Sequence, residues 1–548
     1  MPQLTGPQTG TSQSDLFIGS LEIVDLTENT SDSGILSAAI NSLSGDDTIE
    51  GIATLAPSAS NLDLSATGIS QSIIDSGAGN DTISGLGTAS GKLERFGTRG
   101  PEFSGNATSF GLIRSAVNAR GGDDTLRFAS NSGSGFTIAA TGVSSSIVNG
   151  GTGTDSISIS SRAGAVSDAT AIGSSASSIL GGAQQDTITI EANARASSGT
   201  IGTGSVTVRG AQQSFIDGGS DNDSVTISAT GGSGDSTVSG ITQTQVRGGS
   251  GGDTITINTS STSIGFRGSL GDKSSSIAVE QSSVIDGGGG NDTIDIRSEG
   301  TASGFTSYAV ADSTVRGGSG ADRILLTSAG NGVGNMQSFA ALNADINGGG
   351  DDDILEFTAS ASAGRITAVG AKDSTVKGGG GNDTITFSVA GGTNSGVDSA
   401  GIVGSRIYGN SGDDTIKVTV DSNRPRGGAF ANYDIADALV FGGSGDDTFD
   451  VGIGNGTLRG GVGNDTAVLD YFDNNTMDVV AINNGVRITG SQTKLSEAGN
   501  WSQDIIGVES YQVDGVAYTT SSLLSTFGGA VPEVPDFPAA VESLSAIA

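Results

Sequence analysis

Two apolar columns recur along this chain at intervals far longer than the repeat of a single helix or strand. The first column stands two places after a recurring aspartate and comprises Ile49, Ile83, Leu126, Ile157, Ile188, Val225, Ile255, Ile294, Ile324, Ile354, Ile385, Ile416 and Phe449. The second column precedes the same aspartates, if the turn after Ile346 is one residue shorter, and comprises Ile40, Ile74, Val117, Val148, Ile179, Ile216, Val246, Ile285, Val315, Ile346, Val376, Ile407 and Val440. Inward-facing residues that repeat in this way predict parallel coils stacked in register.

Polar positions follow the same repeat. A small hydroxyl residue stands two places before the second column in most coils, at Ser72, Ser115, Ser146, Ser177, Ser214, Thr244, Ser283, Ser313, Ser374 and Ser405. Since alternate residues of a strand share a face, these hydroxyls should face inward and form a corner of stacked serines. The residue after the second column should face outward, and in consecutive coils it is Asp217, Arg247, Asp286, Arg316, Asn347 and Lys377. Strands stack about 4.8 Å apart, so these charges could pair between coils, although the alternation could also arise by chance.

One glycine-rich phrase separates the two apolar columns. It reads SGAGNDTI at 76–83, GGTGTDSI at 150–157, GGGGNDTI at 287–294 and 378–385, and GGSGDDTF at 442–449. Its aspartates, mostly 30 to 43 residues apart, are Asp47, Asp81, Asp124, Asp155, Asp186, Asp223, Asp253, Asp292, Asp322, Asp352, Asp383, Asp414, Asp447 and Asp465. We therefore predict an all-β fold, a right-handed parallel β-solenoid of about 13 coils with these turns along one edge.

Composition narrows the chemistry of the turns. The chain has 91 glycines, 8 prolines, no cysteine, no histidine and a formal net charge of −34. Such a charge disfavours nucleic acid and anionic membranes as partners and favours cations. Without Cys or His, a metal ion would have to be bound by oxygen ligands.

The stacked aspartates predict a column of calcium sites. Two carboxylates about 4.8 Å apart repel by roughly 3.5 kcal/mol at an effective dielectric constant of 20. Ca²⁺ bound by carboxylate and carbonyl oxygens would reverse this term and couple metal binding to folding. Two turns deviate, because Gln184 and Asp221 replace the second turn glycine; Asp186 could then lack an ion, whereas Asp221 could add a ligand. The alternative is that the aspartates only cap tight turns by hydrogen bonds to the backbone.

The phrase resembles the GGxGxDxUx nonapeptide of RTX (hemolysin-type) calcium-binding proteins. The resemblance covers roughly residues 36–468 and implies several Ca²⁺ ions, with the fourteen aspartates as ligands. Only 442–468 (GGSGDDTFD, VGIGNGTLR, GGVGNDTAV) runs as adjacent nonapeptides, where a β-roll is expected. Elsewhere a single such turn per long coil departs from the family pattern, which leaves the number and spacing of ions open.

The segments outside the repeats have their own expectations. Residues 1–35 should form an N-terminal cap or docking segment, 36–468 the solenoid, and 469–548 a C-terminal β cap that includes the alternating segment 477–490 and the acidic tail 531–548. Residues 91–106 should form a surface insertion. Residues 1–20 lack the basic and apolar regions of a signal peptide, and no segment is long enough to span a bilayer. The cap resembles the region that follows RTX arrays in proteins exported by type I secretion, which implies a secreted, extracellular or cell-surface protein.

Several functions remain possible. The resemblance to RTX surface-layer proteins and to oscillin-like fibril proteins implies a structural protein whose main partner is itself, as a filament or layer, with cell-envelope polysaccharide as a second partner. A calcium-dependent adhesin or carbohydrate-binding protein is the alternative. Polysaccharide lyases and epimerases also use β-helices, but no catalytic cluster is evident, and the only tight basic group is Lys92, Arg95 and Arg99. We therefore expect no enzyme and no catalytic residue. Threonine follows many of the recurring aspartates, but other residues interrupt this column. The interruptions argue against the regular lattice that ice binding would require.

Overall fold

The computed structural model describes most of the chain between residue 3 and residue 528. The described residues are 3–26, 28, 30–57, 62–90, 106–133, 137–165, 167–196, 204–232, 235–262, 274–301, 304–331, 335–362, 365–391, 397–422, 433–452, 454–469, 477–491, 500–513 and 515–528. The predicted insertion at 91–106, except Asn106, lies outside them, as do Lys92, Arg95, Arg99 and the tail 531–548.

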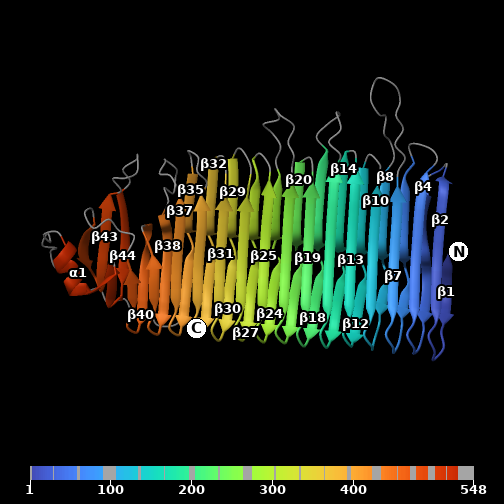
Figure 1. Cartoon of the computed structure of the whole chain (residues 1–548), viewed down its shortest axis with the longest axis horizontal. Helices are drawn as coiled ribbons and strands as arrows, with labels where there is room; N and C mark the ends of the chain where they lie inside the picture. Colours follow the sequence, from blue (N-terminus) through green and yellow to red (C-terminus); the bar gives the residue numbers. More distant parts are fainter. Residues whose placement is uncertain are drawn as a thin grey trace, which may run out of the picture.

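The fold is the predicted parallel β-solenoid, whose coils stack along the long axis of the molecule (Figure 1). A typical coil has three strands, as in β13 (Ser156–Ala165), β14 (Asp168–Ser175) and β15 (Ser178–Ala183). The first belongs to one long parallel sheet and the other two to a second sheet. Each strand pairs in register with its equivalent one coil later, so that Ile157 lies beside Ile188 and Val148 beside Ile179.

One sheet receives one strand from each coil. Its strands are β2 (Leu16–Leu26), β4 (Thr48–Pro57), β7 (Thr82–Ser90), β10 (Thr125–Gly133), β13, β16 (Thr187–Ala196), β19 (Ser224–Gly232), β22 (Thr254–Thr262), β25 (Thr293–Thr301), β28 (Arg323–Gly330), β31 (Ile354–Ala361), β34 (Thr384–Gly391), β37 (Thr415–Ser422), β39 (Thr448–Val451), β41 (Thr466–Val468), β45 (Ser510–Val513) and β46 (Val516–Thr519).

The other sheet contains pairs of shorter strands, separated by a bend. The strands before the bend are β5 (Leu64–Ser70), β8 (Asn106–Ile113), β11 (Thr137–Ser144), β14, β17 (Ser205–Gln212), β20 (Asp235–Thr242), β23 (Ser275–Glu280), β26 (Thr306–Ala311), β29 (Asn335–Leu342), β32 (Arg365–Lys372) and β35 (Val397–Val403). The strands after it are β6 (Ile73–Asp75), β9 (Ala116–Asn118), β12 (Ile147–Thr152), β15, β18 (Phe215–Ser220), β21 (Gln245–Ser250), β24 (Val284–Gly289), β27 (Thr314–Ser319), β30 (Asp345–Gly350), β33 (Thr375–Gly380) and β36 (Arg406–Ser411). Four strands run through the bend: β1 (Leu4–Thr9), β3 (Thr30–Asn41), β38 (Tyr433–Ser444) and β40 (Gly454–Val462).

The two predicted apolar columns form the core between the sheets. Ile188 and Ile179 have no exposed surface, and their equivalents are buried in nearly every coil. One assignment was wrong, because Ile354 is 41% exposed and Leu355 occupies the column. The turn after Ile346 has the same length as the others, so no residue is missing from it.

The predicted serine corner is confirmed and coincides with the bend. One residue there has a positive φ, for example Ala176 at 49°, and Ser177 follows it. The Ser177 hydroxyl donates to the carbonyl of Ser175 (2.8 Å) and accepts the N–H of Ser146 in the preceding coil (3.2 Å). Equivalent hydroxyls in neighbouring coils replace backbone hydrogen bonds that the bend interrupts.

The predicted outward column is in register, but its charges do not simply pair. Asp217, Arg247 and Asp286 lie side by side in successive coils. Among the described ion pairs, none joins Asp217 to Arg247; the guanidinium of Arg247 instead lies 5.5 Å from the ring centre of Phe215. These charges therefore contribute little to holding the coils together.

The two ends of the stack differ. Strands β1 and β2 pair in parallel with β3 and β4, so the stack already includes residues 4–26. At the other end, β42 (Asp478–Ile482), β43 (Gly485–Ser491) and β44 (Asn500–Ile506) form an antiparallel extension, and α1 (Thr520–Phe527) packs against β42 with Leu523 buried. No helix among the described residues is both long and apolar enough to cross a membrane.

Candidate metal centre

Each turn that carries the glycine phrase has six positions, numbered here 1 to 6, with the recurring aspartate at position 6. Position 4 has a positive φ in every such turn, usually at a glycine, such as Gly290 at 118°. Gln184, Asp221 and Asp351 adopt the same left-handed conformation at 71–77°. The substitutions at 184 and 221 therefore leave the turn shape unchanged, and the aspartates that follow them keep their places.

The aspartates at position 6 form one continuous buried column, which we call the carboxylate column. Its members are Asp47, Asp81, Asp124, Asp155, Asp186, Asp223, Asp253, Asp292, Asp322, Asp353, Asp383, Asp414, Asp447 and Asp465, each at most 3% exposed. Thirteen of the fourteen predicted residues thus come together. The turn position predicted for Asp352 was wrong, since the sequence GGGDDD fills all six positions and places Asp353 at position 6 and Asp352 at position 5.

One oxygen of each carboxylate has a structural role. Oδ1 of Asp292 accepts the backbone N–H of Asp253 at 2.7 Å, and Oδ1 of Asp322 accepts that of Asp292 at 2.8 Å. The same bond links every successive pair in the column. The alternative interpretation of the sequence, in which aspartates cap the turns, therefore describes this oxygen well.

Two residues that were not predicted from the repeat form the ends of this chain of bonds. Asp15 donates its N–H to Oδ1 of Asp47 (2.7 Å), and Glu509 accepts the N–H of Asp465 through Oε2 (2.9 Å). Asp15 could have been found, because Gly10 and Phe17 stand at the spacing that the repeat requires. Glu509 gave no such signal, since it lies in a segment without the glycine phrase.

The second oxygen of each carboxylate is buried and has no hydrogen-bond partner, in all fourteen turns of the column. In the glycine turns, this Oδ2 points toward the glycine at position 1. A Cβ added to Gly287 would lie 2.5 Å from Oδ2 of Asp292 and 2.4 Å from the carbonyl oxygen of Gly317 in the next coil. A carboxylate oxygen and a carbonyl oxygen from adjacent coils therefore approach the same glycine.

An unpaired, buried carboxylate oxygen requires a proton or a cation. Burial raises the pKa of Asp292 from 3.8 to about 7, although the N–H of Asp253 opposes the shift. Burial likewise raises the pKa of Asp155 to about 6 and that of Asp353 to about 8. Near neutral pH the column therefore contains both protonated and ionised carboxyl groups, and it can exchange protons for metal ions.

The donor set fits calcium. The column offers only oxygen, as carboxylate and as nearby backbone carbonyl, and Ca²⁺ prefers such ligands. Within the described ranges, no group of three or more His, Cys, Asp or Glu side chains is arranged to hold a metal ion. A bound ion would therefore take one or two carboxylates of the column and complete its shell with backbone carbonyls or water.

Position 5 supplies a second, exposed set of side chains. Oδ1 of Asp352 accepts the N–H of Asn382 at 2.7 Å, and Oδ1 of Asn382 accepts that of Asp413 at 2.7 Å. In these bonds the side chain accepts an N–H of the following coil. In the carboxylate column, by contrast, the side chain accepts an N–H of the preceding coil. Where an Ala or a Gly occupies position 5, as at Ala321 and Gly252, the side-chain link to the next coil is lost.

Fold and site together define an oxygen-only, metal-binding parallel β-solenoid. The family model of the RTX calcium-binding nonapeptide repeat matches residues 71–87, 280–295, 368–388, 405–418 and 438–467. The chain therefore contains RTX calcium-binding repeats, and it binds several Ca²⁺ ions. No curated protein matches the chain.

Proposed function

We propose that this is a secreted structural protein that forms a cell-surface layer or fibril, in which calcium holds the carboxylate column together and stiffens the rod. The observation that carries the proposal is the row of fourteen buried, unpaired Oδ2 atoms along the stack. A column with that many unsatisfied oxygens is costly without cations. Calcium, which is abundant outside cells, would make the rod stable only after export.

The proposal gives the protein itself as its main partner. RTX repeats are typical of secreted proteins, which supports an extracellular location. The net charge of −34 makes calcium bridges between copies chemically reasonable, because ions can join two acidic surfaces as well as two coils. The proposal contains no catalytic step.

The test uses the purified full-length chain in EDTA and in millimolar Ca²⁺. We expect circular dichroism to show more β-structure with calcium and negative-stain microscopy to show rods that assemble into fibrils or sheets only with calcium. Mg²⁺ at equal ionic strength is the control for charge screening. If calcium orders single rods that never assemble at any concentration, the structural role is wrong while calcium binding stands.

A second candidate, a calcium-dependent adhesin, has one observation in its favour. An open groove of about 530 Å³ follows the serine corner and is lined by Ser177, Ser214, Phe215, Gln243 and neighbouring residues. Hydroxyl and amide groups beside an aromatic ring suit recognition of a sugar. Binding to a panel of cell-envelope polysaccharides, lost in Phe215→Ala but retained in Phe387→Leu inside the core, would favour this candidate.

A further inference from the structure

Position 1 of the turn divides the carboxylate column into two groups. Glycine occupies this position in the turns from Gly150 onward, at Gly150, Gly181, Gly218, Gly248, Gly287, Gly317, Gly348, Gly378, Gly409, Gly442 and Gly460. Gly10 has the same place before Asp15, outside the column, but there Oδ2 of Asp15 accepts the N–H of Thr11 at 2.6 Å. The three turns before them, which end at Asp47, Asp81 and Asp124, carry Ser42, Ser76 and Ala119 instead. A side chain therefore stands in three turns where the other turns have none.

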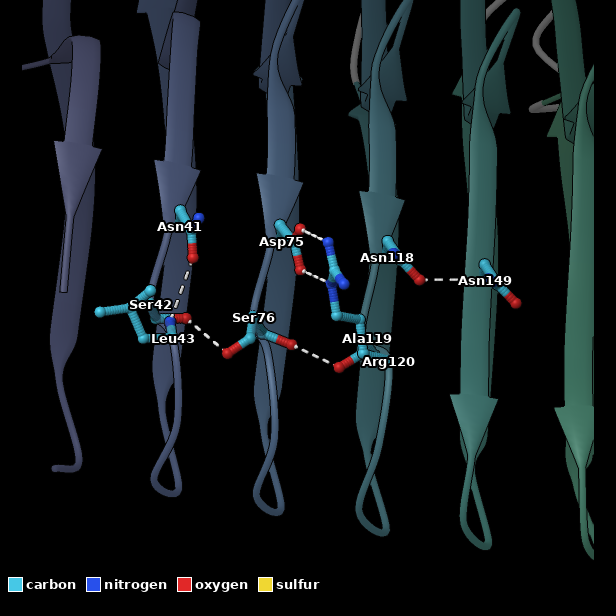
Figure 2. A network of polar contacts seen from close by, with 9 residues as sticks. All are labelled: Asn41, Ser42, Leu43, Asp75, Ser76, Asn118, Ala119, Arg120 and Asn149. Carbon is cyan, nitrogen blue, oxygen red and sulfur yellow. Dashed lines mark hydrogen bonds and ion pairs between the residues drawn. The ribbon is translucent and has the colours of Figure 1, made fainter. Parts of the chain in front are cut away.

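The two serines use the carbonyl that calcium would need. The hydroxyl of Ser42 donates to the carbonyl of Ser76 at 2.9 Å, and that of Ser76 donates to the carbonyl of Ala119 at 3.1 Å (Figure 2). These are position-1 carbonyls of the following coil, equivalent to the Gly317 carbonyl that approaches Gly287. In these turns the oxygen is already hydrogen-bonded.

The side chains also fill the contact region. In the glycine turns a Cβ at position 1 would come within 2.1–2.7 Å of the Oδ2 of its own turn, closer than any ordinary contact. Ser42 and Ser76 are fully buried, as is Ala119, so their Cβ atoms are packed inside rather than turned to solvent. The backbone and carboxylate must therefore be arranged around a side chain here, with less room for an ion.

Other side chains link the coils in the same region. Arg120, at position 2 of the third turn, forms an ion pair with Asp75 of the preceding coil, and the Asn149 amide donates to Asn118 at 3.1 Å (Figure 2).

We propose that the turns ending at Asp47, Asp81 and Asp124 close without calcium and that the calcium column begins at Asp155. The first coils are then a calcium-independent end on which the calcium-dependent coils stack, and the buried, unpaired Oδ2 atoms of its three turns lack the ion that the other eleven turns bind. This inference rests on calcium binding by the carboxylate column, and it excludes an ion from the turn within the matched repeat at 71–87.

The first experiment transfers the serine into a glycine turn of the full-length protein. Gly287→Ser is expected to bind at least one Ca²⁺ fewer than the wild type, measured by equilibrium dialysis with atomic absorption, while circular dichroism in saturating calcium stays the same. The matched control is Gly289→Ser at position 3 of the same turn, where a Cβ would meet only the Ser319 hydroxyl at 3.3 Å and neighbouring coils already carry serine. Equal ion counts for a folded Gly287→Ser and the wild type would overturn the inference.

A second experiment needs no substitution and covers the case in which Gly287→Ser fails to fold. Hydrogen exchange of the wild type is followed in EDTA and in calcium, peptide by peptide. Amides of residues 35–57, 62–90 and 106–131 should keep their protection in EDTA, whereas those of the described strands from 156 onward should lose at least tenfold. If the first coils lose protection together with the rest, the inference is wrong.

The outcomes separate this inference from the proposed function. A wild type that binds no calcium would refute both. A wild type that binds calcium and assembles, beside a folded Gly287→Ser with the same ion count, would refute only the division of the column. Ser76→Gly gives the reverse test, with a gain of at least one ion expected.

Discussion

Replacing Asp292 by asparagine separates the two roles of the carboxylate column. Asparagine keeps an oxygen that can accept the N–H of Asp253, as Oδ1 of Asp292 does at 2.7 Å, but it removes the charge from the buried Oδ2. Without calcium the loss of charge should stabilise the fold, whereas with calcium it removes a ligand. The effect of a single substitution should therefore depend on the ion.

The size of the change in folding stability follows from the pKa of Asp292, which burial raises from 3.8 to about 7. Because the folded-state pKa lies above the unfolded one, the folded state favours the proton, and stability is lost as the pH rises from about 4 to about 7. A shift of this size corresponds to about 4 kcal/mol, at about 1.4 kcal/mol per unit, as an upper limit. At pH 8 in EDTA, Asp292→Asn should thus be more stable than the wild type by up to that amount.

Calcium should remove this advantage. An ion present at 100 times its Kd stabilises the state that binds it by about 2.7 kcal/mol, and the variant loses at least part of this gain. At pH 4 in EDTA the two proteins should be equally stable, since the wild-type carboxyl is then protonated. The exposed Asp345 supplies the control, and Asp345→Asn should change stability little under any of these conditions.

The assay is thermal unfolding followed by circular dichroism at pH 4 and pH 8, with EDTA or with millimolar Ca²⁺. If the calcium-free wild type is unfolded at pH 8, the expected result is that the variant regains β-structure at a higher pH than the wild type during acid titration in EDTA. A variant that is less stable than the wild type by the same amount at both pH values and with or without calcium would refute the reasoning. The column would then be a purely structural set of hydrogen bonds.

Three further predictions concern the whole column, the corner and the turn. In EDTA the unfolding temperature of the wild type should fall as pH rises from about 4 to about 8, because burial raises the pKa values of the column, and calcium binding near pH 7 should release protons that a pH-stat can count. Ser177→Ala should cost about 1–3 kcal/mol in chemical denaturation, since it leaves the N–H of Ser146 unpaired, whereas half-buried Ser178→Ala should cost little; equal effects would contradict the role of the corner. Gly318→Ala should prevent ordered stacking, because its φ is 123° and a Cβ would lie 2.0 Å from the carbonyl oxygen of Gly288, while Gly350→Ala meets nothing within 4 Å; melting curves that coincide would contradict this.

The periodic part of the fold could be predicted from the sequence because stacking imposes a repeat on the residues. Stacked coils repeat the same environment, so Ile179 and Ile188 must recur in every coil as buried residues, and Ser177 recurs because the bend leaves the same backbone groups to satisfy. The turns that carry the aspartates could be predicted for the same reason, and thirteen of the fourteen predicted aspartates lie in one column.

The sequence failed where the repeat is locally ambiguous or ends. Three consecutive acids at 351–353 do not reveal which one faces inward; the fixed length of the stacked turn decides that it is Asp353. Glu509 lies beyond the last glycine phrase, so no repeat spacing marks it.

The sequence by itself determined the length of the repeat, the apolar columns that face inward and the row of aspartate turns along one edge. It also determined the preference for a cation that is bound by oxygen ligands. Only the tertiary structure decided what each carboxylate oxygen does. Neighbouring coils place the N–H of Asp253 against one oxygen of Asp292 and leave the other without a partner beside Gly287. They also bring the Ser76 hydroxyl onto the carbonyl of Ala119, 43 residues further along the chain. The two hydrogen bonds join residues 39 and 43 positions apart, so they depend on the register of the stack.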